Sequence, residues 1–239
     1  MEREWGFARE NSAAMRYGGV IHEVLKTYFE FVRLGRPLSD EAVFEQFRAG
    51  LSKAAIEDAY QHDLYLKQGL EQLRQFLASA RDNTPAVLHT EQYFELKIGD
   101  TTVVGRIDRM DSLGDGKVAI IDYKTGKPKS QDDSDDSLQL SIYAVAAREK
   151  WGYQVDKLVF HNIEDNTAVE TFRNDPALES AKTEVLDVAR QIAHGSFEPR
   201  KSFNCRYCPY RNLCPATEVR MFSGVSSDAQ DSGKPAGKK

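Results

Sequence analysis

Two apolar segments near the middle of the chain each end in an aspartate, and this pattern constrains the fold more than any other feature. In "VVGRIDRMDSLGDGKVAIIDYKTGKPKS", the segment "VVGRI" is followed by Asp108, and "KVAII" is followed by Asp122, with Lys124 two positions later. A carboxylate at the end of a buried strand is costly unless it is paired or bound to a metal ion. The pattern therefore predicts two neighbouring strands that end at a functional site.

The rest of the chain divides into helical and strand-like parts. Within residues 10–82, apolar residues recur at helical spacing in "VIHEVLKTYFEFVRL", "EAVFEQFRAGLSKAAIEDAY" and "LYLKQGLEQLRQFLASA". Between residues 90 and 124, "EQYFELKIG", "TTVVGRIDRM" and "KVAIIDYKTG" predict three strands separated by glycine-containing turns. A helix from about residue 137 to 150, the strands "KLVFHNI" and "TAVETFR", and a helix from about 177 to 194 follow. This order predicts an α/β or α+β sheet with helical additions.

Length and charge limit the class of protein. A chain of 239 residues holds one sizeable core, or at most two small ones. No apolar run approaches the length of a membrane span and the start "MEREWGFARE" lacks the form of a signal peptide, so we expect a cytoplasmic protein with no membrane partner. The formal net charge of −5 argues against a non-specific nucleic-acid coat protein, which would be basic. It does not argue against a nuclease, because metal sites use carboxylates.

The two aspartates suit a divalent cation. Lys124 lies on the same face as Asp122, because strand side chains alternate. Neighbouring carboxylates repel unless a cation lies between them, and oxygen ligands suit Mg²⁺ or Mn²⁺. A lysine beside the ion can position a water and stabilise negative charge on a phosphate, as phosphodiester hydrolysis requires. The alternative interpretation makes Asp108, Asp111 and Asp122 turn residues with Lys124 as a solvated partner, and Asp-x-Lys alone does not decide between the two.

Further segments give the chain a resemblance to a known family. They are "GGVIH" with His22, "GRIDRMD" with Asp108, "IIDYKTG" with Asp122 and Lys124, and "LQLSIYAVA" with Gln139 and Tyr143. With the cysteine segment "CRYCPYRNLC" they span residues 18–214. The chain resembles a PD-(D/E)XK nuclease of the RecB type, close to the AddB C-terminal nuclease and the CRISPR-associated RecB-like exonucleases.

The resemblance implies an α/β fold with a restriction-endonuclease-like core, in which helices flank a central mixed sheet. It also implies an N-terminal helical region and a C-terminal cysteine-rich segment. We expect one nuclease domain over residues 1–222, made of a helical region at 10–82, a catalytic core at 90–195 and a cysteine-rich segment at 196–222. Residues 223–239 lack any core-forming pattern, which predicts a disordered tail.

For the metal site, the resemblance implies roles for five residues. Asp108 and Asp122 would bind the metal, and Lys124 would act on the attacking water. His22 would complete the metal site from the first helix, together with the backbone carbonyl of Tyr123. The alternative for His22 is a half-buried histidine on a helix surface.

Three other polar residues are candidates for the site. The resemblance implies that Gln139 and Tyr143 line the active site or hold the substrate backbone, and their i, i+4 spacing places both on one side of a helix. The alternative for this pair is the margin and core of an ordinary amphipathic helix. Glu91 is a further candidate, which we interpret as an ordinary strand position.

All three cysteines of the chain fall in one C-x2-C-x5-C motif, made of Cys205, Cys208 and Cys214. Such clustering in a cytoplasmic protein argues for metal binding rather than disulfides. The resemblance implies a [4Fe–4S] cluster, which needs four ligands, usually thiolates. No cysteine precedes Cys205 in this sequence. Either the chain is a fragment of a longer protein, or the fourth ligand is not a cysteine, or the metal differs, with Zn²⁺ held by three cysteines and one histidine as the alternative.

The function predicted from these features is that of a metal-dependent DNA nuclease. We expect an exonuclease module for DNA repair or recombination that acts on single-stranded DNA and works with a helicase. No Walker motif occurs, so the chain itself is not expected to hydrolyse ATP. The alternatives are a catalytically inactive PD-(D/E)XK domain that binds DNA or a partner, and a zinc-stapled interaction module.

Overall fold

A computed structural model describes residues 12–206, 208, 210–211 and 213–216. The chain divides into a larger compact unit, Glu10–Gly195, and a second unit that includes Ser196–Lys239. The predicted disordered tail, 223–239, lies outside the described residues.

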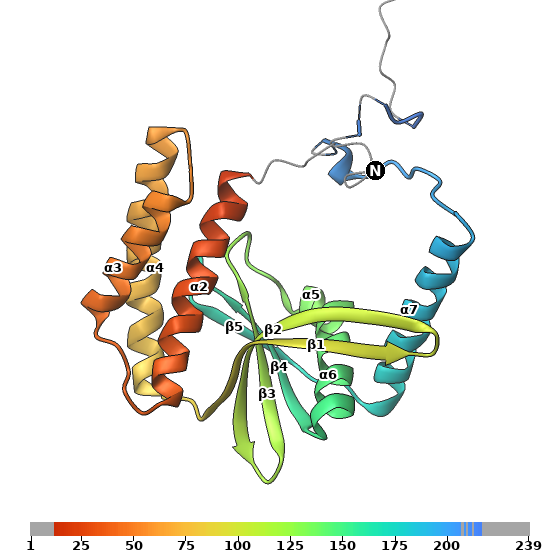
Figure 1. Ribbon diagram of the computed structural model, residues 1–239, viewed down its shortest axis with the longest axis horizontal. Helices are drawn as coiled ribbons and strands as arrows, with labels where there is room; N and C mark the ends of the chain where they lie inside the picture. The colour runs from red at the N-terminus through yellow and green to blue at the C-terminus, as the bar shows by residue number, and fades with distance from the viewer. Residues whose placement is uncertain (1–11, 207, 209, 212, 217–239) are drawn as a thin grey trace, which may run out of the picture. The chain divides into compact units, whose positions relative to one another are not determined.

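A five-stranded mixed sheet forms the centre of the larger unit, with the strand order β1-β2-β3-β4-β5 (Figure 1). The strands are β1 (Val87–Ile98), β2 (Thr101–Gly114), β3 (Lys117–Lys124), β4 (Gln154–Asn162) and β5 (Thr167–Thr171). β3 and β4 run parallel, whereas the other neighbouring strands are antiparallel. The predicted α/β class with a mixed sheet is therefore confirmed.

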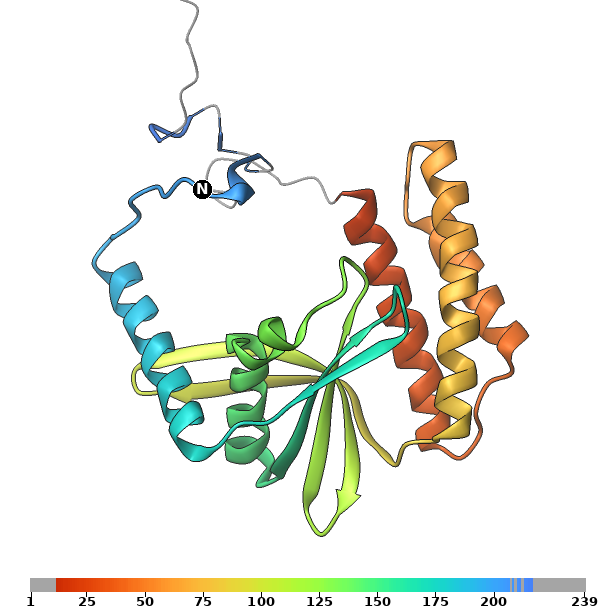
Figure 2. The same cartoon turned by 180° about the vertical axis from the view of Figure 1, so that it is seen from behind.

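Helices cover both faces of the sheet (Figures 1 and 2). They are α2 (Ala13–Arg33), α3 (Asp40–Lys53), α4 (Ala59–Asp82), α5 (Gln131–Asp135), α6 (Leu138–Trp151) and α7 (Asp175–Ala193). α2, α3 and α4 share one hydrophobic core with Ala119, Ile121 and Tyr123 of β3. α6 and α7 share the other core with Val118 and Ile120 of the same strand. Because β3 is buried on both faces, its sequence reads as a continuous apolar run rather than an alternating one.

Three features differ from the expected secondary structure. Asp108 does not end its strand, because β2 continues to Gly114 and pairs with β3 along that stretch. The helical pattern over residues 41–60 is interrupted, because Ala55 adopts a left-handed conformation with φ of 51°. The Asp58 side chain then caps α4 by accepting a hydrogen bond from the amide of Gln61, so a new helix begins there. The acidic stretch after Ser130 forms the short helix α5, which begins with a capping box between Ser130 and Asp133.

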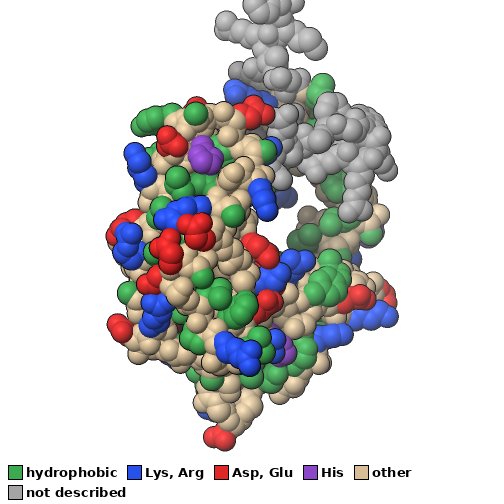
Figure 3. All heavy atoms as spheres, turned by 60° about the vertical axis from the view of Figure 1, so that its left-hand side comes forward, with side chains coloured by type: hydrophobic (Ala, Val, Ile, Leu, Met, Phe, Trp, Pro, Cys, Tyr) green, Lys and Arg blue, Asp and Glu red, His purple; other side chains and the backbone are tan. Residues whose placement is uncertain are grey.

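The outer surface of the helical layer carries interspersed charges of both signs (Figure 3). Its ion pairs are Arg48 with Glu41 and Glu45, Arg74 with Glu71, and Arg81 with Asp40. This surface therefore does not present the single-sign basic field that attracts a nucleic acid. Among the described helices, none is both long enough and apolar enough to cross a membrane.

Candidate metal centre

Glu91 and Asp108 lie opposite each other in the hairpin formed by β1 and β2. The flanking residues Gln92 and Ile107 are partners in the antiparallel register, so the next pair along the hairpin is Glu91 and Asp108. Glu91 has a φ of 45°, a left-handed conformation that residues with a side chain rarely adopt. Strained backbone of this kind is concentrated at functional sites, where the surrounding structure maintains it.

His22 reaches these two carboxylates from helix α2. Its Nδ1 atom lies 3.4 Å from Asp108 Oδ2 and 3.9 Å from Glu91 Oε1. The three residues each offer one ligand atom, and these atoms all lie within 4.8 Å of one another. Across the described residues, this is the one group of histidine, cysteine and acidic side chains close enough to hold a metal ion.

Glu91 therefore lies within the candidate metal group, although the sequence suggested an ordinary strand position. The position of Glu91 opposite Asp108 follows from the position of the turn at Gly99. Ile98 pairs with Thr101 across this turn, and counting seven positions outward along both strands leads to Glu91 and Asp108. The register of the hairpin, rather than any local motif, brings these carboxylates together.

A second cluster joins the end of β3 to helix α6. The Asp122 side chain is buried, with 3% of the residue exposed, and its Oδ2 lies 2.5 Å from the ammonium of Lys124. The Gln139 amide donates to Asp122 Oδ1 at 2.8 Å and to the Tyr143 hydroxyl at 2.8 Å. Lys124 donates to the Gln139 carbonyl oxygen at 3.0 Å. The structure thus brings together four residues that the sequence assigned to one site.

The backbone of Tyr123 connects the two clusters. Its amide N–H donates to Asp108 Oδ2 at 2.8 Å, which holds the β2 carboxylate against the end of β3. Burial raises the pKa of Asp122, the nearby charge of Asp108 raises it further, and Lys124 acts in the opposite direction. The two aspartates therefore interact electrostatically, as predicted. The proposed ligand role of the Tyr123 carbonyl stays a prediction.

These side chains fit a divalent cation. Asp122 Oδ2 is enclosed and accepts no hydrogen bond of regular geometry, although Lys124 lies beside it. A buried carboxylate is costly unless a cation compensates it, and without a metal the Lys124 ammonium does so for Asp122. Carboxylate oxygens with one imidazole nitrogen suit Mg²⁺ and Mn²⁺, and the donor set therefore fits the predicted metals.

Without a metal, a proton on His22 neutralises part of the charge in this group. Burial acts to lower the pKa of His22, but the hydrogen bonds to Asp108 and Glu91 outweigh it and raise the pKa to about 10. The same interaction with His22, helped by Arg106, lowers the pKa of Glu91 despite its burial. At neutral pH the imidazolium therefore lies where a metal ion would be coordinated.

The three cysteines lie in the second unit of the chain. None of the three forms a disulfide among the described residues and each is partly buried, and Cys205 Sγ accepts a hydrogen bond from the amide of Ser202 at 3.3 Å. Where the structure describes this segment, the thiols do not gather into a group of metal-ligand atoms. Metal binding by Cys205, Cys208 and Cys214 stays a prediction.

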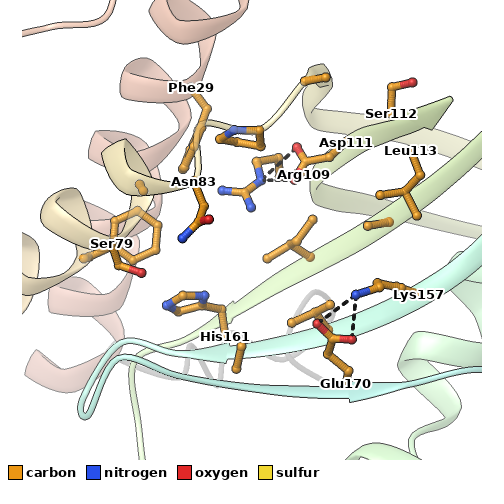
Figure 4. Close-up of a pocket in the computed structure, with 18 residues that line it drawn as sticks. Phe29, Ser79, Asn83, Arg109, Asp111, Ser112, Leu113, Lys157, His161 and Glu170 are labelled. Carbon is orange, nitrogen blue, oxygen red and sulfur yellow. Dashed lines mark hydrogen bonds and ion pairs between the residues drawn. The ribbon is translucent and has the colours of Figure 1, made fainter.

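A cavity of about 510 Å³ lies on the sheet face covered by α2 and α4 (Figure 4). It is lined mainly by apolar side chains, with the paired Arg109 and Asp111 on one wall and His161 on another. Burial lowers the pKa of His161, so this histidine is neutral at physiological pH. None of the residues predicted for the active site lines this cavity, so it is separate from the metal group.

Comparison with known proteins agrees with this geometry. The profile of the PD-(D/E)XK nuclease superfamily matches residues 1–215. The chain belongs to the PD-(D/E)XK nuclease superfamily. Membership of this superfamily agrees with the carboxylates and lysine that converge where Asp108 of β2 meets the end of β3.

A solved structure shares the fold of this PD-(D/E)XK protein. A protein from Eubacterium rectale, described as a candidate exonuclease, aligns with a TM-score of 0.53 and 16% identity, covering 94% of this chain and 85% of its own. The protein SSO0001 aligns with a TM-score of 0.38 and 20% identity over 65% of this chain and 78% of its own. At these identities the first comparison shows the fold alone. A search of curated protein sequences gave no match.

Proposed function

We propose that this PD-(D/E)XK protein is a Mg²⁺- or Mn²⁺-dependent deoxyribonuclease with an exonuclease mode of action. The observation that carries the proposal is the position of the His22, Glu91 and Asp108 group next to the buried pair of Asp122 and Lys124. A set of metal ligands beside a buried carboxylate and an ammonium group has the parts that phosphodiester hydrolysis requires. The superfamily assignment makes a nucleic acid the expected substrate class.

His22, Glu91, Asp108 and Asp122 would hold the metal ion. A bound Mg²⁺ or Mn²⁺ would supply Lewis-acid polarisation of the scissile phosphate and a water of lowered pKa. The protein's own contribution is to keep these side chains in place before the substrate arrives, as the hydrogen bond from the Tyr123 amide to Asp108 does.

Lys124 and α6 would act on the reacting atoms. The Lys124 ammonium is held by Asp122 and Gln139, so it can orient a water and stabilise negative charge developing on the phosphate. The Gln139 amide holds both the Asp122 carboxylate and the Tyr143 hydroxyl. Burial raises the pKa of Tyr143, and the charge of Asp122 raises it further, so this hydroxyl stays protonated and can donate to a substrate oxygen.

We further propose that the protein is of the RecB-like type. The supporting feature is the delivery of His22 to the carboxylates from the N-terminal helix α2, as the "GGVIH" segment suggested. The RecB resemblance also favours an association with a helicase, which would supply single-stranded DNA and a larger DNA-binding surface. The same resemblance supports a role in DNA repair or recombination.

The test of the proposal is a degradation assay with end-labelled linear and covalently closed circular single-stranded DNA. We expect Mg²⁺ or Mn²⁺ to support degradation of the linear strand and EDTA to abolish it. The circular strand should persist, because an exonuclease needs an end. Asp108→Ala should be inactive at every metal concentration. Equal degradation by the wild type and Asp108→Ala would contradict the proposed site, and rapid cutting of circles would contradict the exonuclease mode.

A further inference from the structure

The outer half of the β1–β2 hairpin presents an exposed face that begins beside the metal group. We call this surface the hairpin face, and it consists of the cross-strand pairs Tyr93–Arg106, Glu95–Val104 and Lys97–Thr102. All six side chains are exposed. The opposite face of the same strands is buried against α6 and α7 through Phe94, Leu96 and Ile98.

Arg106 links the hairpin face to the metal group. Its guanidinium donates to Glu91 Oε2 at 3.2 Å, and its side chain is 63% exposed. Only Nη1 makes this contact, so the remaining N–H groups of the fork face solvent. A planar guanidinium with free donors binds phosphate oxygens strongly, because it can form two parallel hydrogen bonds.

Tyr93 is the cross-strand partner of Arg106 and is 54% exposed. Among the described residues, its ring stacks on no other ring and its hydroxyl forms no hydrogen bond. The alternation of side chains along β1 places Tyr93 on the exposed face, opposite the buried Phe94. The ring is therefore an exposed aromatic surface two residue pairs along the hairpin from Glu91 and Asp108.

We propose that Tyr93 and Arg106 form a binding site for one nucleotide of single-stranded DNA. One base stacks on the Tyr93 ring, while Arg106 contacts the phosphate next to the one that is cleaved. Stacking requires a base whose face is free, which single strands and frayed ends offer and an intact duplex does not. This inference rests on the proposed function, since it names the residues that hold the substrate beside the metal group.

The rest of the hairpin face contributes less to this site. Glu95 lies between the Tyr93–Arg106 pair and Lys97, and its carboxylate repels a phosphate backbone that continues along the hairpin. The two basic residues on this face are therefore separated by an acidic one. The favourable contacts are confined to the pair nearest the metal group, which makes this a one-nucleotide site rather than a track.

The experiment measures binding separately from cleavage. Affinity for a fluorescein-labelled single strand is determined by anisotropy in EDTA, where metal-dependent hydrolysis does not occur, for the wild type, Tyr93→Ala and Tyr93→Trp. The matched control is Tyr60→Ala, which removes a tyrosine that is 79% exposed on the distant helix α4. A strand that carries 2-aminopurine at successive positions reports which base stacks, because stacking changes the fluorescence of this base analogue.

We expect Tyr93→Ala to weaken single-strand binding about tenfold and to raise KM more than it lowers kcat, whereas Tyr93→Trp and Tyr60→Ala retain wild-type affinity. Arg106→Lys should weaken binding less than Arg106→Ala, since lysine keeps the positive charge but lacks the planar guanidinium group.

Wild-type affinity in Tyr93→Ala, or no single-strand binding by the wild type, would overturn the inference. If the wild type cleaves no DNA but Tyr93→Ala still weakens binding, the site stands and the proposed activity falls. If Tyr93→Ala binds and cleaves normally, the activity stands and the site falls.

Discussion

Gly18 of helix α2 lies so close to Thr125 that a Cβ atom added to the glycine would sit 2.7 Å from the threonine hydroxyl oxygen. Thr125 directly follows Lys124 at the end of β3. The absence of a side chain at Gly18 therefore allows α2 to contact the chain beside Lys124. His22 lies four positions further along the same helix, so this contact places the imidazole over the carboxylates.

The first prediction concerns this contact. Gly18→Ala should force Thr125 or α2 to move, because 2.7 Å is far inside van der Waals contact. We expect Gly18→Ala to be less stable than Gly19→Ala by about 1–3 kcal/mol in urea unfolding, and to need more metal for activity. Gly19 has open space around its Cβ position, so Gly19→Ala should gain up to about 1 kcal/mol from helix propensity.

A double variant tests the cause. Gly18→Ala combined with Thr125→Ala removes the hydroxyl that the added methyl group meets, so the metal requirement should return toward that of Thr125→Ala alone. Purely additive effects of the two substitutions would show that the contact does not position His22.

The second prediction concerns Glu91. If it is a metal ligand, Glu91→Gln should raise the metal concentration needed for half-maximal activity at least about tenfold, because it removes one anionic ligand. Glu95→Gln, four positions along the same strand and exposed, is the control and should leave the metal titration unchanged. Identical titrations for the two variants would remove Glu91 from the metal group.

The third prediction concerns pH. Metal must displace the proton on His22, whose pKa is about 10, so apparent metal affinity should rise by about tenfold per pH unit between pH 7 and pH 9. From the ordinary histidine pKa alone, this dependence would end near pH 6.5. Calorimetry in buffers of different ionisation enthalpy should detect about one proton released per metal bound. A metal affinity that is constant over this range would contradict coordination by His22.

The protonated His22 also affects stability without metal. Because its pKa is raised from 6.5 to about 10, its stabilising contribution is fully present below about pH 6.5 and is lost as the pH rises through about 10. In EDTA, the Tm of the wild type should therefore fall relative to that of His22→Asn over this interval. Parallel Tm curves would show that the imidazolium does not interact with the carboxylates.

The fourth prediction separates catalysis from stability at Asp122. Since burial and Asp108 raise its pKa, the ionised carboxylate destabilises the metal-free protein as the pH rises above the ordinary value. Asp122→Asn should therefore be at least as stable as the wild type in EDTA at pH 8, while losing at least about a hundredfold in cleavage rate.

The control is Asp156→Asn, which breaks an ion pair with Lys117 outside the metal group. Since Lys117 holds the pKa of Asp156 low, this variant should lose a little stability and keep full activity. Wild-type cleavage by Asp122→Asn would contradict the site.

The fifth prediction concerns the cysteine motif. If the three thiols bind metal, the binding free energy becomes folding free energy for the segment that contains them. Cys208→Ser should then expose the chain after Ser196 to limited proteolysis, whereas Ser202→Ala, in the same segment, should not. A brown protein containing iron and sulfide after anaerobic purification would identify a cluster, and a colourless zinc protein would identify the alternative. Metal-free protein whose proteolysis is unaffected by Cys208→Ser would exclude both.

The sequence by itself predicted the α/β class and placed Asp108 and Asp122 on neighbouring strands, although Asp108 lies inside β2 rather than at its end. Burial explains this success, because a strand covered on both faces reads as a continuous apolar run, and an aspartate that ends such a run needs a partner. The i, i+4 spacing of Gln139 and Tyr143 likewise predicted their shared orientation, and the structure shows both in one hydrogen-bond network.

Only the tertiary structure decided which side chains meet. Glu91 enters the metal group through the register of a hairpin whose turn lies seven positions away, and the pKa of His22 depends on two strands that are distant in sequence. Local periodicity predicts which face of its helix or strand a side chain occupies. Its burial, its distances to other groups and its pKa depend on the residues that folding places around it. The sequence therefore determined the strands and the kinds of side chain that they carry, whereas the packing of α2 against the hairpin brought His22, Glu91 and Asp108 together.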